Sequence, residues 1–227
     1  MLFVFVAGAS ASGKTEIAKK IVETFNGMNI KTILIKMDDF YKSQQERGGI
    51  VEIDFDVPDA YQWVLLENQL TMLSEGKTIN KPVYCFIAKN RLPHTETINP
   101  EDLKVVVVEG ILALHQVHKM ELPKMSLFVE TDSYKTILER RKTRDAIHRA
   151  TSPQETGARE RRSVGPEFFK YILPSKTNAD LAVTNNDMPA NVLPGVKTGI
   201  DKAADEIMDK IREDHSELFP ARAYSPI

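Results

Sequence analysis

The chain has a single cysteine, Cys85, among its 227 residues, which excludes an internal disulfide and is typical of a reducing compartment. None of its apolar runs approaches the roughly 18 residues that predict a membrane span. The net charge of −2 at pH 7 provides no overall basic field that would attract nucleic acid. Internal repeats and low-complexity segments are absent as well. We therefore expect a cytoplasmic chain that binds neither membrane nor nucleic acid.

Strand patterns and helix patterns alternate along the sequence, which is 42% hydrophobic. The first apolar run has six residues and no basic lead-in, so we expect a strand there and not a signal peptide. Strands are expected at about 2–7, 32–37, 105–108, 126–130 and 181–184, with helices at about 14–25, 134–149 and 200–211. This order predicts an α/β fold with a parallel sheet flanked by helices.

Two smaller features complete the expected single domain over residues 1–227. A β-ribbon is expected at about 77–98, with its strands at 77–87 and 94–98, and a helical lid that bears arginines at about 134–170. A further helix is expected to begin at Pro58, with Asp59 as its N-cap and Gln62 at its third helical position.

The most specific motif is a complete G-x-x-x-x-G-K-[ST] phosphate loop between the first strand and the first helix. Its glycines allow backbone N–H groups to surround a polyphosphate at the positive end of the helix. Lys14 is expected to contact the terminal phosphates, and the Thr15 hydroxyl to hold Mg²⁺. The motif therefore predicts binding of a nucleoside triphosphate by Gly8, Ala9, Ser10, Ala11, Ser12, Gly13, Lys14 and Thr15.

Two acidic side chains follow predicted strands, at the edge of the sheet where ligands collect in folds of this kind. Asp38 follows the second strand, and Glu109 follows the buried run Val105–Val108. Phosphate transfer to a hydroxyl needs a carboxylate to accept the proton, and Mg²⁺ needs oxygen ligands. We predict that Asp38 is the general base and that Glu109 reaches Mg²⁺, often through water.

The predicted lid helix carries Arg140, Arg141 and Arg144, with Arg149 one turn further on. A charge run of this kind is often a solvated helix face. At helical spacing Arg141, Arg144 and Arg149 spread over roughly 140° of the helix surface, so we expect about two of them to reach a bound triphosphate. The later arginines, at 159, 161 and 162, alternate with Glu160 and are expected on the surface.

Further motifs occur in a fixed order along the chain. They are Asp38-Asp39-Phe40-Tyr41-Lys42, Asp54-Phe55-Asp56-Val57-Pro58-Asp59-Ala60, Pro82-Val83-Tyr84-x-Phe86, Val108-Glu109-Gly110-Ile111, Phe128-Val129-Glu130-Thr131-Asp132, Arg140-Arg141-x-x-Arg144-Asp145 and Leu173-Pro174-Ser175-Lys176-x-x-Ala179-Asp180. With these motifs the chain resembles the uridine kinase and phosphoribulokinase family of P-loop kinases. The resemblance implies a P-loop NTPase-type sheet and an Mg²⁺-dependent kinase. Such a kinase transfers the γ-phosphate of ATP or GTP to the 5′-hydroxyl of a nucleoside such as uridine or cytidine.

The resemblance also implies residue roles. Asp38 matches the family's general base, and Asp56 is similar to the carboxylate that accepts the vicinal ribose hydroxyls. Tyr41, Phe55 and Tyr84 resemble walls of the nucleoside pocket, with ordinary core packing as an equal alternative. In the lid, Arg141 and Arg149 resemble arginines that contact the substrate, and Arg144 is assigned to the nucleotide. The family is often oligomeric, so a homo-oligomer is a further expectation.

The chain departs from the family pattern where uridine and cytidine kinases read the base. Cys85 and Lys89 stand in place of an Asp and a His, and Arg149-Ala150-Thr151 replaces Arg-Gly-Arg. Lys89 with Arg91 would suit an anionic acceptor such as a sugar phosphate, which keeps that acceptor open as an alternative. A nucleotide-driven switch or motor is disfavoured, because the chain lacks an N-K-x-D motif and has Glu109-Gly110 where a motor would carry Asp-Glu.

Overall fold

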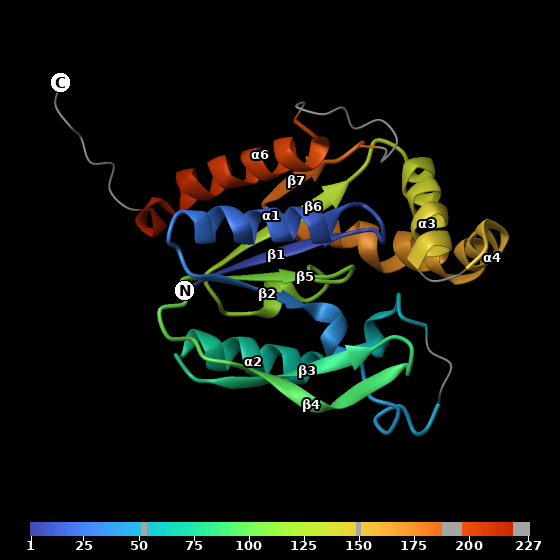
Figure 1. Cartoon of the computed structure of the whole chain (residues 1–227), viewed down its shortest axis with the longest axis horizontal. Helices are drawn as coiled ribbons and strands as arrows, with labels where there is room; N and C mark the ends of the chain where they lie inside the picture. The colour runs from blue at the N-terminus through green and yellow to red at the C-terminus, as the bar shows by residue number, and fades with distance from the viewer. Residues whose placement is uncertain (51–53, 149–150, 188–196, 220–227) are drawn as a thin grey trace.

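The computed structural model describes residues 1–50, 54–148, 151–187 and 197–219, and its centre is a parallel sheet of five strands (Figure 1). The strand order across the sheet is β2-β5-β1-β6-β7. The strands are β1 (Leu2–Gly8), β2 (Thr32–Lys36), β5 (Val105–Glu109), β6 (Lys124–Glu130) and β7 (Leu181–Thr184). All four pairings are parallel, so the carboxyl ends of the strands lie along one edge.

Two layers cover the sheet. On one face lie α1 (Lys14–Gly27) and α6 (Gly199–Asp214), and on the other lie α2 (Trp63–Ser74) and an antiparallel ribbon of β3 (Ile79–Cys85) and β4 (Asn90–Ile98) (Figure 1). Alternate residues of β1 enter the two cores: Val4 packs with the α1 and α6 side, Phe5 with the α2 side. The four valines of β5 are fully buried, as expected for a central strand covered on both faces.

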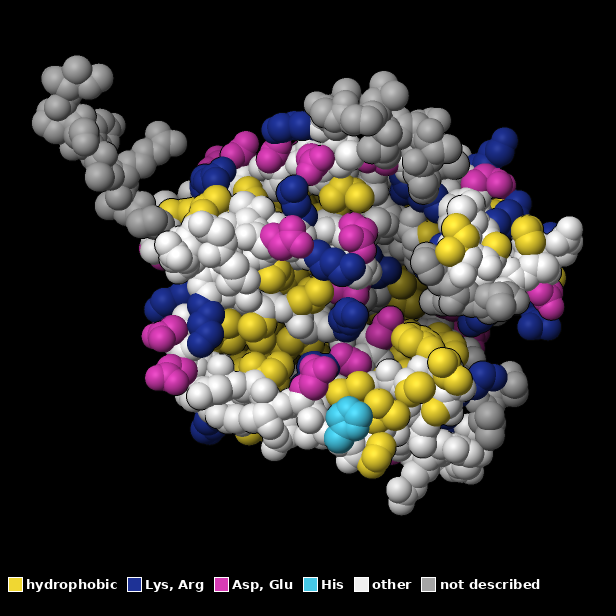
Figure 2. Space-filling model, viewed as in Figure 1, with side chains coloured by type: hydrophobic (Ala, Val, Ile, Leu, Met, Phe, Trp, Pro, Cys, Tyr) yellow, Lys and Arg dark blue, Asp and Glu magenta, His cyan; other side chains and the backbone are white. Residues whose placement is uncertain are grey.

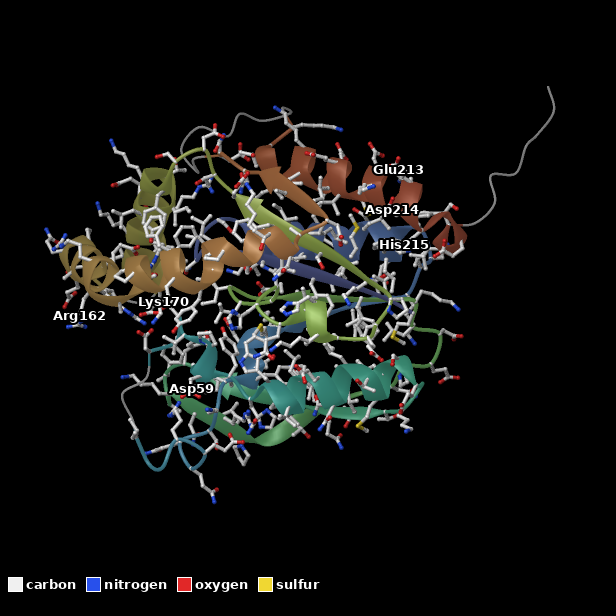
Figure 3. All side chains as sticks on the ribbon, turned by 180° about the vertical axis from the view of Figure 1, so that it is seen from behind. Asp59, Arg162, Lys170, Glu213, Asp214 and His215 are labelled. Atoms are coloured by element: carbon white, nitrogen blue, oxygen red, sulfur yellow. The ribbon has the colours of Figure 1, made fainter. Side chains whose placement is uncertain are left out.

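Helical segments gather at the edge where the strands end. The lid comprises α3 (Tyr134–His148), α4 (Pro153–Arg159), α5 (Gly165–Glu167), two π-helical turns at Glu160–Val164 and Phe168–Ile172, and a 3₁₀ turn at Leu173–Asn178. Further 3₁₀ turns lie at Met37–Phe40, Pro58–Ala60, Val117–Lys119 and Ser216–Leu218. From behind, Arg162 and Lys170 lie on the lid, whereas Glu213, Asp214 and His215 lie at the far end of the molecule (Figure 3).

The predicted fold class is confirmed, and two element boundaries are wrong. Helix α2 begins at Trp63, not at Pro58, and Asp59 does not cap it but pairs with Lys42 at 2.8 Å. The reason is a tertiary contact: the amide of Gln62 donates to the Phe40 carbonyl at 2.8 Å, which keeps the chain extended up to the start of α2. Strand β4 begins at Asn90, four residues before the expected His94.

The described helices include none that combines the length and the apolar composition needed to cross a bilayer.

Candidate active site

The phosphate loop follows β1 directly and leads into α1, as the motif predicts. Its two motif glycines have φ values of +148° at Gly8 and +96° at Gly13, which side chains rarely adopt. A Cβ at Gly8 would lie 2.3 Å from the carbonyl oxygen of Val129, and one at Gly13 would lie 2.2 Å from Nδ2 of Asn185. Both positions therefore require glycine for space as well as for conformation.

Two side chains from later elements support this loop. Nη1 of Arg140 donates to the Ser12 carbonyl at 3.3 Å, and Nδ2 of Asn185 donates to the same oxygen at 3.0 Å. Nη2 of Arg140 also donates to the Asn185 carbonyl at 2.9 Å. Arg140 therefore anchors the loop from behind. The Ser12 hydroxyl is buried without a hydrogen-bond partner among the described residues, which suits a loop that is built to receive a ligand.

The predicted catalytic residues meet in one cleft of about 660 Å³ at the carboxyl edge of the sheet, which we call the main cleft. Figure 2 shows the molecular surface hollowed between the lid and the layer that contains the ribbon. Lys14, Thr15, Asp38 and Glu109 all line this cleft. The Thr15 hydroxyl donates to Oε2 of Glu109 at 3.1 Å, so the two predicted Mg²⁺ ligands are adjacent.

The position of Asp38 depends on close packing between two strand ends. Asp38 lies in the 3₁₀ turn that follows β2, next to β5 in the sheet. Gly110 follows β5, and a Cβ on it would lie 2.6 Å from Cβ of Met37. The absence of a side chain at Gly110 lets the turn approach the end of β5, which brings Asp38 and Glu109 into the same cleft.

The electrostatics of the cleft favour a base at Asp38. Burial, reinforced by the negative charge of Glu109, raises the pKa of Asp38 to about 6. The positive charge of Lys14 acts in the opposite direction. A carboxyl group with this pKa is largely ionised at pH 7 and yet more basic than an ordinary aspartate, as general base catalysis requires.

Aromatic side chains form part of the wall of the main cleft. Tyr41, Phe55 and Phe86 line the cleft, with ring centroids 5.0 Å apart for Tyr41–Phe55 and 5.4 Å apart for Phe55–Phe86. The Tyr41 hydroxyl donates to the Phe55 carbonyl at 3.0 Å and accepts from Tyr61 at 2.6 Å, so Tyr41 is also a core residue. Tyr84 packs behind it and does not line the cleft.

Phe86 was not predicted as a site residue, although it belongs to the same motif as Tyr84. It lies in the turn that follows β3, and its ring centroid is 5.5 Å from that of Tyr84. Ile87 and Lys89 also line the main cleft.

Asp56 is a second acidic group in the cleft and is only 6% exposed. No described residue donates a hydrogen bond to its carboxylate, so both oxygens remain able to accept from a ligand. Burial raises the pKa of Asp56, and the nearby positive charge of Arg141 opposes that shift. A buried carboxylate with free acceptor capacity is well suited to hold two hydroxyl groups.

Two of the predicted lid arginines reach the main cleft, Arg141 and Arg144. Nη1 of Arg144 donates to the Ser10 hydroxyl of the phosphate loop at 3.1 Å. Arg141 is 3% exposed and is bonded to Glu160. Arg149 lies outside the described residues.

The expectation for the later charge cluster was partly wrong. Arg159, Arg161 and Arg162 are exposed as expected, but Glu160 is only 5% exposed. Arg159 also lines the main cleft, together with Thr151. A π-helical turn that starts at Glu160 changes the side-chain directions that regular α-helical spacing would give.

A second groove of about 290 Å³ adjoins the phosphate loop on its other side. It is lined by Gly13, Arg140, Asn185 and Thr198, among others. Its position next to the loop suits the base and sugar of a nucleotide whose phosphates occupy the loop.

The donor set fits Mg²⁺ better than a metal that requires a protein cage. The described residues contain no group of three His, Cys, Asp or Glu side chains that could hold an ion. Mg²⁺ commonly binds through one or two carboxylates together with substrate phosphates and water. The adjacent oxygens of Thr15 and Glu109 at the mouth of the phosphate loop match that mode.

The sequence matches one protein family over most of its length. The model of the phosphoribulokinase / uridine kinase family matches residues 3–192. The chain is 37% identical to uridine-cytidine kinase B of Dictyostelium discoideum over 180 residues, which cover 78% of this chain and 72% of that protein. It is 31% identical to a uridine kinase of Ureaplasma urealyticum over 188 residues, 82% of this chain and 89% of that protein.

Other curated relatives are considerably longer, and the chain covers 38% to 40% of three of them. Among solved structures, the D-glycerate 3-kinase of Cryptococcus neoformans has the same fold, with a TM-score of 0.59, 13% identity, and coverage of 87% of this chain and 89% of that one. The fold, the complete phosphate loop and the extent of the sequence match together show that the chain belongs to the phosphoribulokinase / uridine kinase family of P-loop kinases.

Proposed function

We propose that this chain is a nucleoside kinase that transfers the γ-phosphate of ATP to the 5′-hydroxyl of uridine or cytidine. The observation that carries the proposal is the convergence in one cleft of three groups: the phosphate loop, a carboxyl group whose pKa is near 6, and the buried carboxylate of Asp56. Relatives that are named uridine or uridine-cytidine kinases support the choice of acceptor.

The donor nucleotide occupies the phosphate loop in this proposal. Backbone N–H groups of residues 8–15 surround its phosphates, and Lys14 and Arg144 offset the charge that develops on the transferred group. Mg²⁺ between Thr15 and Glu109 would supply further charge neutralisation of the phosphates. The second groove takes the base of the donor.

The acceptor occupies the opposite end of the main cleft. Asp56 accepts hydrogen bonds from the 2′- and 3′-hydroxyls of the ribose, and the base lies against the aromatic wall formed by Tyr41, Phe55 and Phe86. Asp38 takes the proton of the 5′-hydroxyl as that oxygen attacks the γ-phosphorus, and ADP leaves with the electrons of the broken bond.

An anionic acceptor is the second candidate function. Lys89, Arg141 and Arg159 all line the main cleft, so three cationic side chains face the space that the acceptor would occupy. Their positive charge favours an anionic acceptor such as a sugar phosphate.

The test is ADP release from Mg-ATP across uridine, cytidine, purine nucleosides, ribulose 5-phosphate and pantothenate. Turnover with uridine or cytidine is the expected result. Turnover restricted to ribulose 5-phosphate or pantothenate would support the anionic alternative, and no turnover with any compound would contradict both kinase assignments.

A further inference from the structure

Three side chains form a buried network in the lid. Nη1 of Arg141 donates to Oε2 of Glu160, and the Tyr134 hydroxyl donates to the other carboxylate oxygen, Oε1. Arg141 and Glu160 are 3% and 5% exposed, so the ion pair is shielded from solvent and from salt. Only Arg141 of the three lines the main cleft.

The local fold is arranged around Glu160. The π-helical turn Glu160–Val164 directs its side chain inward, while Arg161 and Arg162 stay exposed. Gly165 lies directly against it, since a Cβ there would be 2.9 Å from the Glu160 carbonyl oxygen and 3.3 Å from Oε1. Larger residues at position 165 would therefore displace the carboxylate.

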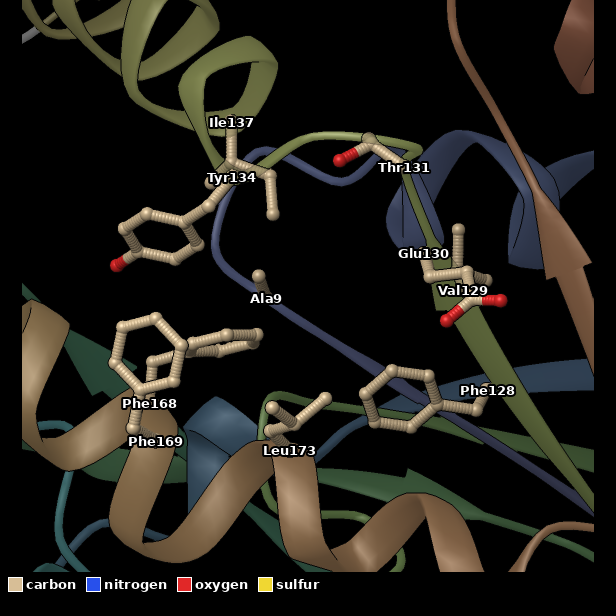
Figure 4. Close-up of a pocket in the computed structure, with 10 residues that line it drawn as sticks. All are labelled: Ala9, Phe128, Val129, Glu130, Thr131, Tyr134, Ile137, Phe168, Phe169 and Leu173. Carbon is tan, nitrogen blue, oxygen red and sulfur yellow. The ribbon is translucent and has the colours of Figure 1, made fainter.

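The Tyr134 ring is fixed independently by aromatic packing. Its centroid lies 4.9 Å from that of Phe168 and 5.2 Å from that of Phe169. Figure 4 shows Tyr134 on α3 beside these two rings, and all three line a small cavity of about 180 Å³ together with Ala9 of the phosphate loop. Tyr134 thus holds Glu160 from a rigid position between α3 and the rest of the lid.

Arg141 lies near two buried carboxylates, Glu160 and Asp56. It is bonded to Glu160, while its positive charge still lowers the pKa of Asp56 against the effect of burial. Its Nε is buried without a hydrogen-bond partner among the described residues. A guanidinium released from Glu160 would gain most by pairing with Asp56, because an unpaired buried carboxylate attracts it strongly.

We propose that Glu160 and Tyr134 are positioning residues that keep Arg141 from closing onto Asp56, so that Asp56 stays free to accept the acceptor's hydroxyls. This inference rests on the proposed function, because it assigns Asp56 to acceptor binding. It makes the affinity for the acceptor depend on Glu160 and Tyr134, two side chains that do not line the main cleft.

The test compares uridine binding by Glu160→Gln and Tyr134→Phe with that of the unmodified chain, measured by calorimetry in the presence of a non-hydrolysable ATP analogue and Mg²⁺. We expect Kd for uridine to rise about tenfold in Glu160→Gln and about threefold in Tyr134→Phe, with Kd for the ATP analogue changed less than twofold. Glu139→Gln is the matched control: it removes a partly exposed ion pair with Lys142 on α3 and should leave both constants unchanged.

A double-mutant cycle separates positioning from a merely structural role. In an Arg141→Ala background, Glu160→Gln should change uridine affinity less than twofold, because the group that it restrains is gone. An equal tenfold loss in both backgrounds would overturn the inference. If Glu160→Gln does not fold, Tyr134→Phe gives the same comparison with its threefold effect.

Failure of the proposed function has a different signature. If the unmodified chain neither binds nor phosphorylates uridine, the proposed function is contradicted. The restraint of Arg141 by Glu160 is then tested by NMR of the Arg141 guanidinium. Its N–H signals should be resolved and slowly exchanging in the unmodified chain and averaged in Glu160→Gln. Identical signals in the two proteins would contradict the restraint of Arg141 by Glu160.

Discussion

Burial and charge act together on a single carboxyl group, Asp38, and their sum determines what that group can do. Burial and the nearby Glu109 favour its protonated form, whereas Lys14 favours the ionised form. The result is a carboxyl group that is more basic than an ordinary aspartate and still ionised at neutral pH. The sequence placed Asp38 at a strand end, but it could not show the shift, which arises from the packing of β2 beside β5.

Replacing Asp38 by Asn should lower phosphoryl transfer by about 10²- to 10⁴-fold, because the proton acceptor is lost. ATP affinity should remain within a fewfold of the original value, since Asp38 does not belong to the phosphate loop. Steady-state kinetics and ATP titration measure the two effects. Full activity in this variant would refute the assignment of the base.

The same substitution should raise the melting temperature at pH 7.5. The folded-state pKa of about 6 lies above the ordinary 3.8, so folding is penalised wherever the group is ionised. This penalty is complete above about pH 6 and disappears below pH 3.8, where the carboxyl is protonated in both states. Calorimetric scans should therefore show a higher melting temperature for the Asp38→Asn variant at pH 7.5 and no increase at pH 3.5. An equal increase at both pH values would mean that the charge of Asp38 is not its cause.

The pH dependence of kcat/KM for the acceptor follows from the same group. Activity should fall on the acid side with an apparent pKa of about 6, because protonated Asp38 cannot accept the hydroxyl proton. Values of kcat/KM measured from pH 5 to pH 8 would show this fall on the acid side. A profile that stays flat down to pH 5 would contradict this account of Asp38.

At the scale of elements, the site depends on what happens immediately after each strand. The sequence predicted this well for the phosphate loop, for Asp38 and for Glu109, because each follows a strongly apolar run. It predicted the start of α2 wrongly, because a local capping pattern at Asp59 is overridden by contacts with residues 40–42 that are not visible from local sequence. It also placed Glu160 on the surface, because a regular helical period does not anticipate a π turn.

A side chain at Gly110 should disturb the approach of two strand ends. In Gly110→Ala the new Cβ would meet Met37 at 2.6 Å, so the turn that carries Asp38 must shift. We expect a loss of ~1–3 kcal/mol in the free energy of unfolding and a clear drop in kcat. Urea unfolding and kinetics measure both.

Gly27→Ala is the control, because nothing lies within 4 Å of a Cβ at that position. It should leave both quantities nearly unchanged. Equal effects of the two substitutions would show that crowding at Met37 is not the cause.

At the scale of the whole molecule, the main cleft lies between two bodies that come from distant parts of the sequence. The lid lies on one side and the ribbon with its neighbouring loop on the other (Figures 1 and 2). Family motifs in the sequence predicted which segments take part. They did not predict that Tyr84 would lie behind the wall and Phe86 within it, or that Arg159 would enter the cleft, because these outcomes depend on how the layers meet.

Closure of these two bodies over bound substrates should be visible by hydrogen exchange. Segments 43–50, 134–148 and 151–165 should exchange more slowly with an ATP analogue, Mg²⁺ and uridine together than with either ligand alone, because closure orders both sides of the cleft. The last two turns of helix α6, which lie away from the second groove, serve as the internal reference. Unchanged exchange in both segments would argue against a closing lid.

The most direct test of the central claim is transfer of labelled γ-phosphate from ATP to uridine, compared with 5′-deoxyuridine, which lacks the reacting hydroxyl. The account predicts labelled 5′-monophosphate from uridine and none from 5′-deoxyuridine. Label that appears only as inorganic phosphate, at the same rate with and without uridine, would contradict the assignment of this chain as a nucleoside kinase.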